Sequence, residues 1–120
     1  MKVLLGIGGT DGSVEALDRT VARALEAGDD LTIAIVEDES DDTDDLNARV
    51  ESVRSETDLS VDVRHVEGEP GSKLVDIAET EGFDEIVLGG STTSPMGKIK
   101  INQTAEFVLL NSHVTVTLVR

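Results

Sequence analysis

Short apolar runs alternate along the chain with longer stretches in which apolar residues recur every three or four positions. Most of the short runs are continuous in Val, Ile and Leu, which is the pattern of strands buried on both faces of a parallel sheet. In the third run, Val61 and Val63 alternate with Asp62 and Arg64, as expected for a strand nearer a sheet edge. The expected strands cover residues 3–7, 31–36, 61–66, 85–89 and 114–119.

Four amphipathic stretches lie between these runs and predict helices with one buried side. Pro70 fits the first turn of the third helix, and Gly28 and Gly82 are suited to end the first and third helices. Asp42 or Thr43 can cap the second helix. The residues expected on the helix faces that meet the core are Val14, Leu17, Val21, Ala24 and Leu25, then Leu46, Val50 and Val53, then Leu74, Ile77 and Ala78, and finally Ile101, Ala105, Val108 and Leu109.

Strands and helices therefore alternate as β-α-β-α-β-α-β-α-β, which predicts one α/β domain over residues 1–120. We expect a doubly wound parallel sheet with helices on both faces and right-handed crossovers. In the strand order 3-2-1-4-5 the winding reverses between the first and fourth strands, and ligands bind beyond the carboxyl ends of strands at such a reversal. Both strands run into loops of small residues, at 8–13 and 89–94. The pattern therefore predicts a crevice between these two loops.

The charge of the chain narrows the classes of partner. It has 25 acidic and 10 basic residues and a formal net charge of −15, which argues against nucleic acid and anionic membranes as direct partners. Self-repulsion of this size is screened by salt, so we expect adaptation to a salt-rich cytoplasm. Residues 37–45 are rich in acidic side chains but lack the ligand spacing of a calcium loop, and are expected to form a solvated loop. The chain has no cysteine and no apolar run long enough to span a membrane.

The two glycine-rich loops resemble known phosphate-binding motifs, but neither matches its motif fully. The first glycine-rich turn carries Asp11 where the dinucleotide fingerprint needs a glycine, which favours a tight turn capped by Asp11 or Ser13. The second loop lacks the spacing of a P-loop. Lys98 and Lys100 follow it and are either ordinary surface lysines or point charges for a phosphate.

A hydrolase is the weakest of the enzyme hypotheses. Ser91 follows two glycines, as in the start of a nucleophile elbow, but Thr93 replaces the last glycine of that motif. A triad would need His65 or His113, which are the only histidines and are expected at the surface or at strand ends. We therefore assign no catalytic residue and no metal ligand.

Several segments of the chain resemble the universal stress protein family, and together they cover almost all of it. They are residues 3–10 (VLLGIGGT) with the first helix, 68–71 (GEPG), 74–78 (LVDIA), 82–89 (GFDEIVLG) and 116–120 (VTLVR). The resemblance implies a five-stranded, Rossmann-like sheet of the adenine nucleotide alpha hydrolase-like type. It also implies a homodimer paired through the last strand, which begins at Val114 and ends at Val119. The nucleotide-binding branch of the family holds ATP through Gly-x2-Gly-x9-Gly followed by Ser or Thr.

The chain departs from that motif after its first glycine, Gly89. Thr92 and Asn102 stand in place of the second and third glycines, Gln103 replaces the hydroxyl residue, and Gly8 replaces an aspartate that family members carry after the first strand. Thr92 puts a side chain where backbone must approach phosphate, and Asn102 adds bulk. The candidate nucleotide-contacting residues are Gly6, Ile7, Gly8, Gly89, Gly90, Ser91, Thr92, Lys98, Asn102 and Gln103, with Ile35 and Val36 as the aliphatic surface for a base.

The leading hypothesis is a non-enzymatic stress-response or signalling module, cytoplasmic and homodimeric, with weak or absent adenine-nucleotide binding. The alternative is a genuine ATP- or AMP-binding member of the family, which includes the possibility of a slow ATPase. A small hydrolase using Ser91 ranks third.

Overall fold

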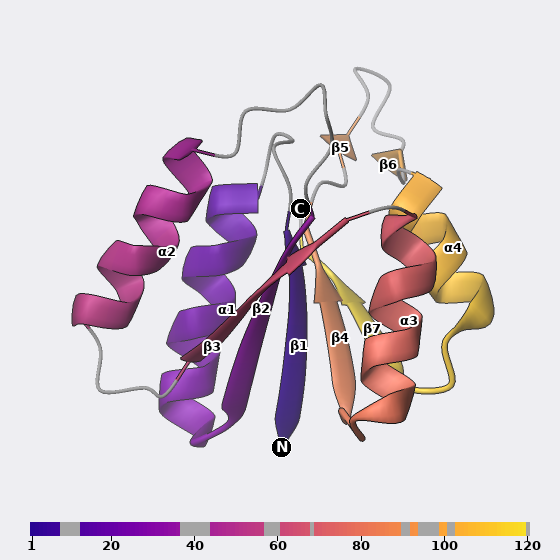
Figure 1. Ribbon diagram of the computed structural model, residues 1–120, viewed down its shortest axis with the longest axis horizontal. Helices are drawn as coiled ribbons and strands as arrows, with labels where there is room; N and C mark the ends of the chain where they lie inside the picture. The colour runs from indigo at the N-terminus through magenta and orange to yellow at the C-terminus, as the bar shows by residue number, and fades with distance from the viewer. Residues whose placement is uncertain are drawn as a thin grey trace.

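The computed structural model describes residues 1–7, 13–36, 44–56, 61–67, 69–89, 92–93, 99–100 and 103–119. Five parallel strands form a sheet of order β3-β2-β1-β4-β7, flanked by four helices (Figure 1). This confirms the doubly wound fold and the order 3-2-1-4-5 expected from the sequence. The strands are β1 (Lys2–Ile7), β2 (Asp30–Val36), β3 (Val61–Val66), β4 (Glu85–Leu88) and β7 (Thr115–Leu118); the helices are α1 (Ser13–Ala27), α2 (Asp44–Glu56), α3 (Pro70–Thr80) and α4 (Gln103–Asn111).

The sheet separates two apolar cores. Helices α1 and α2 cover one face, where Leu5 of β1 packs in a cluster with Leu17 of α1 (Figure 1). Helices α3 and α4 cover the other face, where Leu4 packs in a cluster with Leu74 of α3 and Val108 of α4. All five side chains are fully buried, and each contributes about 1.5–3 kcal/mol by leaving water. The alternation of Leu4 and Leu5 between the faces explains why β1 carries no charged residue from Val3 to Ile7.

The helix boundaries follow the expected local chemistry. Pro70 begins α3, where its missing N–H costs no hydrogen bond. Gly28 and Gly82 follow α1 and α3 with φ of +71° each, a conformation that is strained for other residues. The proposed caps Asp42 and Thr43 lie outside the described residues.

Three expectations about the helices are wrong. The acidic loop does not extend to residue 45, because α2 already begins at Asp44; acidic residues are favoured in a first helical turn. Leu25 is 47% exposed, because the buried side of α1 is turned toward Ala16, Thr20 and Ala24. Leu109 is 42% exposed, since α4 lies beside the edge strand β7 and its buried side is formed by Ala105 and Val108 instead.

A polar clamp ties the edge strand β3 to the end of α3. Arg64 of β3 forms a bidentate ion pair with Glu81, the residue that follows α3. The hydrogen bonds from the Arg64 guanidinium lower the pKa of the Glu81 carboxyl below its ordinary value. Lys2 joins the same region, because its Nζ donates to the Glu81 carbonyl oxygen at 2.7 Å and lies 4.5 Å from the centre of the Phe83 ring.

None of the described helices is both long enough and apolar enough to cross a bilayer.

Candidate functional site

The carboxyl ends of β1 and β4 lie next to each other, as the predicted crevice requires. The two strands pair in parallel, with Gly6 opposite Leu88. The strand order runs outward from this pair in both directions, to β2 and β3 on one side and to β7 on the other. The reversal point of the winding is therefore at Ile7 and Gly89, where the two glycine-rich loops begin.

The side chains at this reversal point are mostly buried. Ile7 and Leu88 are 2% and 3% exposed, and Gly89 is partly exposed. Ile35, which pairs with Ile7 across the sheet, is fully buried in the core under α1 and α2. Val36 is the last residue of β2. That Ile35 and Val36 offer an aliphatic surface to a nucleobase stays a prediction.

Gly6 has a packing role that the sequence did not reveal. A Cβ atom at this position would lie 2.9 Å from Leu74 Cδ1 and 3.0 Å from Leu88 Cδ2. Carbon atoms pack at about 3.5–4.0 Å, so any side chain at residue 6 would push into α3 and β4. The absence of a side chain at Gly6 thus lets α3 pack directly on β1.

A short ribbon follows β4 and was not expected. Strand β5 (Thr92–Thr93) pairs in antiparallel fashion with β6 (Ile99–Lys100), and Thr92 is opposite Lys100. In Figure 1 the ribbon lies near the upper end of α4, at the carboxyl edge of the sheet. Thr92 is thus in the ribbon and Gln103 begins α4. The remaining predicted site residues, namely Gly8, Gly90, Ser91, Lys98 and Asn102, lie outside the described residues.

The two histidines occupy separate surface positions, as expected. His65 is exposed on the edge strand β3. His113 is 87% exposed at its side chain, and its Nδ1 lies 3.2 Å from Glu79 Oε1. In the part of the chain that is described, no three His, Asp or Glu side chains gather in a way that could hold a metal ion.

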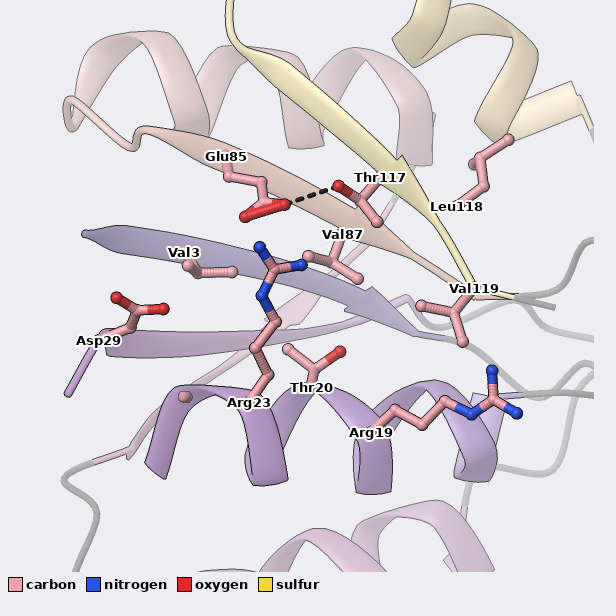
Figure 2. A pocket seen from close by; sticks show the side chains of 11 residues that line it. Val3, Arg19, Thr20, Arg23, Asp29, Glu85, Val87, Thr117, Leu118 and Val119 are labelled. Atoms are coloured by element: carbon pink, nitrogen blue, oxygen red, sulfur yellow. Dashed lines mark hydrogen bonds between the residues drawn. The ribbon is translucent and has the colours of Figure 1, made fainter. Parts of the chain in front are cut away.

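A second concave region lies on the face of the sheet that α1 covers (Figure 2). It is a cavity of about 370 Å³ between α1 and strands β1, β4 and β7. Val3, Val87 and Val119 form apolar walls, and Arg19, Thr20, Arg23, Asp29, Glu85 and Thr117 add polar groups. Val3 and Glu85 are near the amino ends of their strands, whereas Leu118 and Val119 lie at the carboxyl end of β7, so the cavity runs along the strands on this face of the sheet.

One family model matches this chain. The family model described as "Universal stress protein family" matches residues 34–120, which is most of the chain. Among curated protein sequences, no match is found.

Similar solved structures carry the same description. The chain is similar to a universal stress protein from Archaeoglobus fulgidus, with 20% identity, a TM-score of 0.75 and coverage of 100% of this chain and 98% of that one. It is similar to the protein UspA from Lactobacillus plantarum, with 19% identity, a TM-score of 0.79 and coverage of 100% and 97%. A third structure, the A. fulgidus universal stress protein in complex with dAMP, is 17% identical, with a TM-score of 0.70 and coverage of 100% and 98%.

Proposed function

Since the chain belongs to the universal stress protein family, we propose that it acts as a non-enzymatic stress-response or signalling module whose crevice binds adenine nucleotides weakly or not at all. The observation that carries this proposal is the composition of the loop beyond Gly89, at the reversal point of the sheet. Only the first of the three motif glycines is present, and Thr92 and Asn102 replace the others. A side chain at these positions keeps a phosphate from the backbone N–H groups that would bind it.

A genuine ATP or AMP binder is the second candidate, because related structures favour it. One universal stress protein of similar fold is described in complex with cAMP and another in complex with dAMP. Under this alternative, the first-strand turn and residues 89–103 hold the nucleotide, with slow ATP hydrolysis as a further possibility.

Calorimetric titration with ATP and Mg²⁺ in molar KCl separates the two candidates. The wild-type chain should show little or no heat of binding. The triple variant Thr92→Gly, Asn102→Gly and Gln103→Ser restores the family motif and should bind more tightly, because it reopens the approach to the phosphates. Tight binding by the wild type that is abolished by Gly89→Val would refute the proposal and establish the nucleotide binder.

The proposed oligomer is a homodimer that forms through β7. This strand lies at one edge of the sheet and pairs on one side only, with β4. Its Val116 and Leu118 are half-buried and continue the apolar face covered by α3 and α4. An unpaired edge of β-branched residues favours pairing with a second strand. The high negative charge supports an intracellular, salt-rich setting as part of the same proposal.

A further inference from the structure

The cavity beside α1 brings cationic, anionic and apolar groups together in one space that is partly open to solvent. At about 370 Å³ it falls at the small end of the range of about 300–1,000 Å³ that is typical of sites for small molecules. It lies on the face of the sheet under α1, whereas the predicted crevice lies beyond the carboxyl ends of β1 and β4. Its lining includes Thr117, Leu118 and Val119, on and just after the strand through which the homodimer is proposed to form, so the experiment has to separate a small ligand from a second copy of the chain.

Two arginines of this cavity lack the acidic partners that the other described arginines have. Arg49, Arg54 and Arg64 each pair with a carboxylate. Arg19 and Arg23, one helical turn apart on α1, form no ion pair or hydrogen bond through their side chains within the described part of the chain. In a chain with 25 acidic residues this is unusual, and it leaves two guanidinium groups available to a carboxylate ligand.

Figure 2 shows that the two guanidinium groups extend along different parts of the cavity. Arg23 points from α1 toward β1 and β4, into the space between Val3 and Val87, whereas Arg19 points toward Val119 at the end of β7. Both side chains are exposed to solvent but have apolar groups beside them in the cavity, Val3 and Val87 near Arg23 and Val119 near Arg19.

The opposite wall offers hydrogen-bond acceptors. Glu85 is 4% exposed, and its Oε1 accepts a hydrogen bond of 2.6 Å from the Thr117 hydroxyl. Its other oxygen has no partner among the described residues, and no ion pair joins it to Arg23. Since no described side-chain polar atom is both buried and without a partner, this oxygen is open to solvent and can accept a hydrogen bond from a ligand in the cavity.

Thr20 is a second polar group that opens onto this space. Its side chain is 7% exposed, yet its hydroxyl makes no hydrogen bond to another described residue. In the described part of the chain, every fully buried polar side-chain atom has a hydrogen-bond partner. The Thr20 hydroxyl has none, so it is open to solvent and faces the cavity, as Figure 2 shows. It provides a further hydrogen bond for a ligand between Arg23 and Glu85.

From these groups we infer that the cavity is a binding site for an aliphatic amino acid. The ligand carboxylate contacts Arg23, the ammonium group contacts Glu85, and the aliphatic side chain packs on Val3 and Val87. A zwitterion matches the two opposite charges that the cavity presents. A nucleotide matches them less well, because its phosphates would come close to the carboxylate of Glu85, whereas Asp29 is already paired with the amino-terminal ammonium group.

L-leucine is the probe for this inference, with two analogues that each lack one charge. In 4-methylpentanoate the ammonium group is missing, and in 3-methylbutylamine the carboxylate is missing. Titration calorimetry and ¹H–¹⁵N NMR in molar KCl should show that L-leucine binds and shifts the amide signals of α1 and β4. Each analogue should bind at least about tenfold more weakly, which is the loss expected for one charged hydrogen bond.

Two variants assign the charges to their partners. Arg23→Met should weaken L-leucine at least about tenfold and leave 3-methylbutylamine unchanged, because that amine has no carboxylate for Arg23. Glu85→Gln keeps an acceptor for Thr117 and should weaken L-leucine without affecting 4-methylpentanoate. Lys73→Met is the control: Lys73 is an exposed cation on α3, over the other face of the sheet, and its replacement should change nothing.

Three results would overturn the inference. The first is the absence of L-leucine binding at millimolar concentration. The second is equal binding of L-leucine and both analogues, which would mark an apolar cavity without charge recognition. The third is a set of α1 and β4 signals that move with protein concentration and not with L-leucine, which would mean that a second copy of the chain fills the cavity. Arg23→Met lies at an exposed position and should fold, so the test stands even if Glu85→Gln does not fold.

Discussion

Gly6 gives the sharpest test of how the sheet and α3 fit together. We expect Gly6→Ala to destabilise the protein, because the new Cβ would lie 2.9 Å from Leu74 Cδ1 and 3.0 Å from Leu88 Cδ2. Leu74 is fully buried and Leu88 is 3% exposed, so neither side chain can turn toward solvent. Overpacking of this kind costs about 1–3 kcal/mol in free energy of unfolding.

The same substitution should have a different effect when Leu74 is already shortened. Leu74→Ala alone should cost about 2–5 kcal/mol, since it leaves a cavity in the core under α3 and α4. It also removes the two Leu74 Cδ atoms that crowd residue 6, whereas Leu88 Cδ2 remains 3.0 Å from the added Cβ. In that background Gly6→Ala should therefore cost clearly less than in the wild type, because the added methyl group enters the space that Leu74 left and only the contact with Leu88 has to relax.

Urea unfolding of the four members of this double-mutant cycle, at one fixed KCl concentration, measures the coupling. Gly28→Ala is the matched control, because Gly28 has a φ of +71° and a Cβ added there would meet no neighbouring atom within 4 Å. Its cost arises from backbone strain, about 1–2 kcal/mol, and should be the same with Leu74 or Ala at residue 74. If Gly6→Ala costs as much in the Leu74→Ala background as in the wild type, crowding by Leu74 is not why residue 6 is glycine.

Three further predictions concern charge and association. Arg64 lowers the pKa of Glu81 in the folded state. The stabilisation from this pair is therefore present above the ordinary glutamate pKa of about 4.3 and is lost as pH falls through the folded value. As pH is lowered from about 7 to about 3, the urea midpoint should fall more steeply for the wild type than for Glu81→Gln. The thermal unfolding midpoint should rise with KCl concentration, because salt screens the repulsion that comes with a net charge of −15. A midpoint that is highest without salt would contradict this. Val116→Pro should abolish a dimer that forms through β7, while the fold persists. The reason is that the Val119 N–H donates to the Leu88 carbonyl oxygen, and because N–H directions alternate along a strand, the Val116 N–H points to the free edge. Light scattering measures the mass, and a dimer of unchanged mass would exclude pairing through β7.

The architecture was accessible from the sequence because it depends on features that a pattern displays. A short, mostly apolar run rich in β-branched residues, such as residues 31–36, favours a strand covered on both faces. Pro70, Gly28 and Gly82 mark helix ends through their backbone properties. The residue pattern alone left the strand order open. The order 3-2-1-4-5 was expected because it places the two glycine-rich junctions side by side, and the pairing of β1 with β4 confirms it.

What escaped prediction depends on contacts between distant segments. The rotation of α1 that buries Thr20 and exposes Leu25 is set by how the helix packs on the sheet, and both residues fit the periodic pattern almost equally well. The packing role of Gly6 requires Leu74, which is far away in the sequence. The ribbon formed by β5 and β6 consists of two residues per strand, too few for any periodic signal.

The cavity beside α1 left one trace in the sequence that a closer reading would find. Glu85 opens an otherwise apolar run that becomes β4, and a carboxylate at such a position is costly unless it meets a partner. Arg19 and Arg23 are spaced four residues apart on the helix that crosses this strand, and neither is followed by an acidic residue four positions later. A buried acid in a strand and two cations on the helix above it are separately unremarkable. Only the sheet order, which places β4 beside β1 under α1, brings them to opposite walls of one cavity, and that juxtaposition makes a zwitterion a better match than a ligand of either single charge.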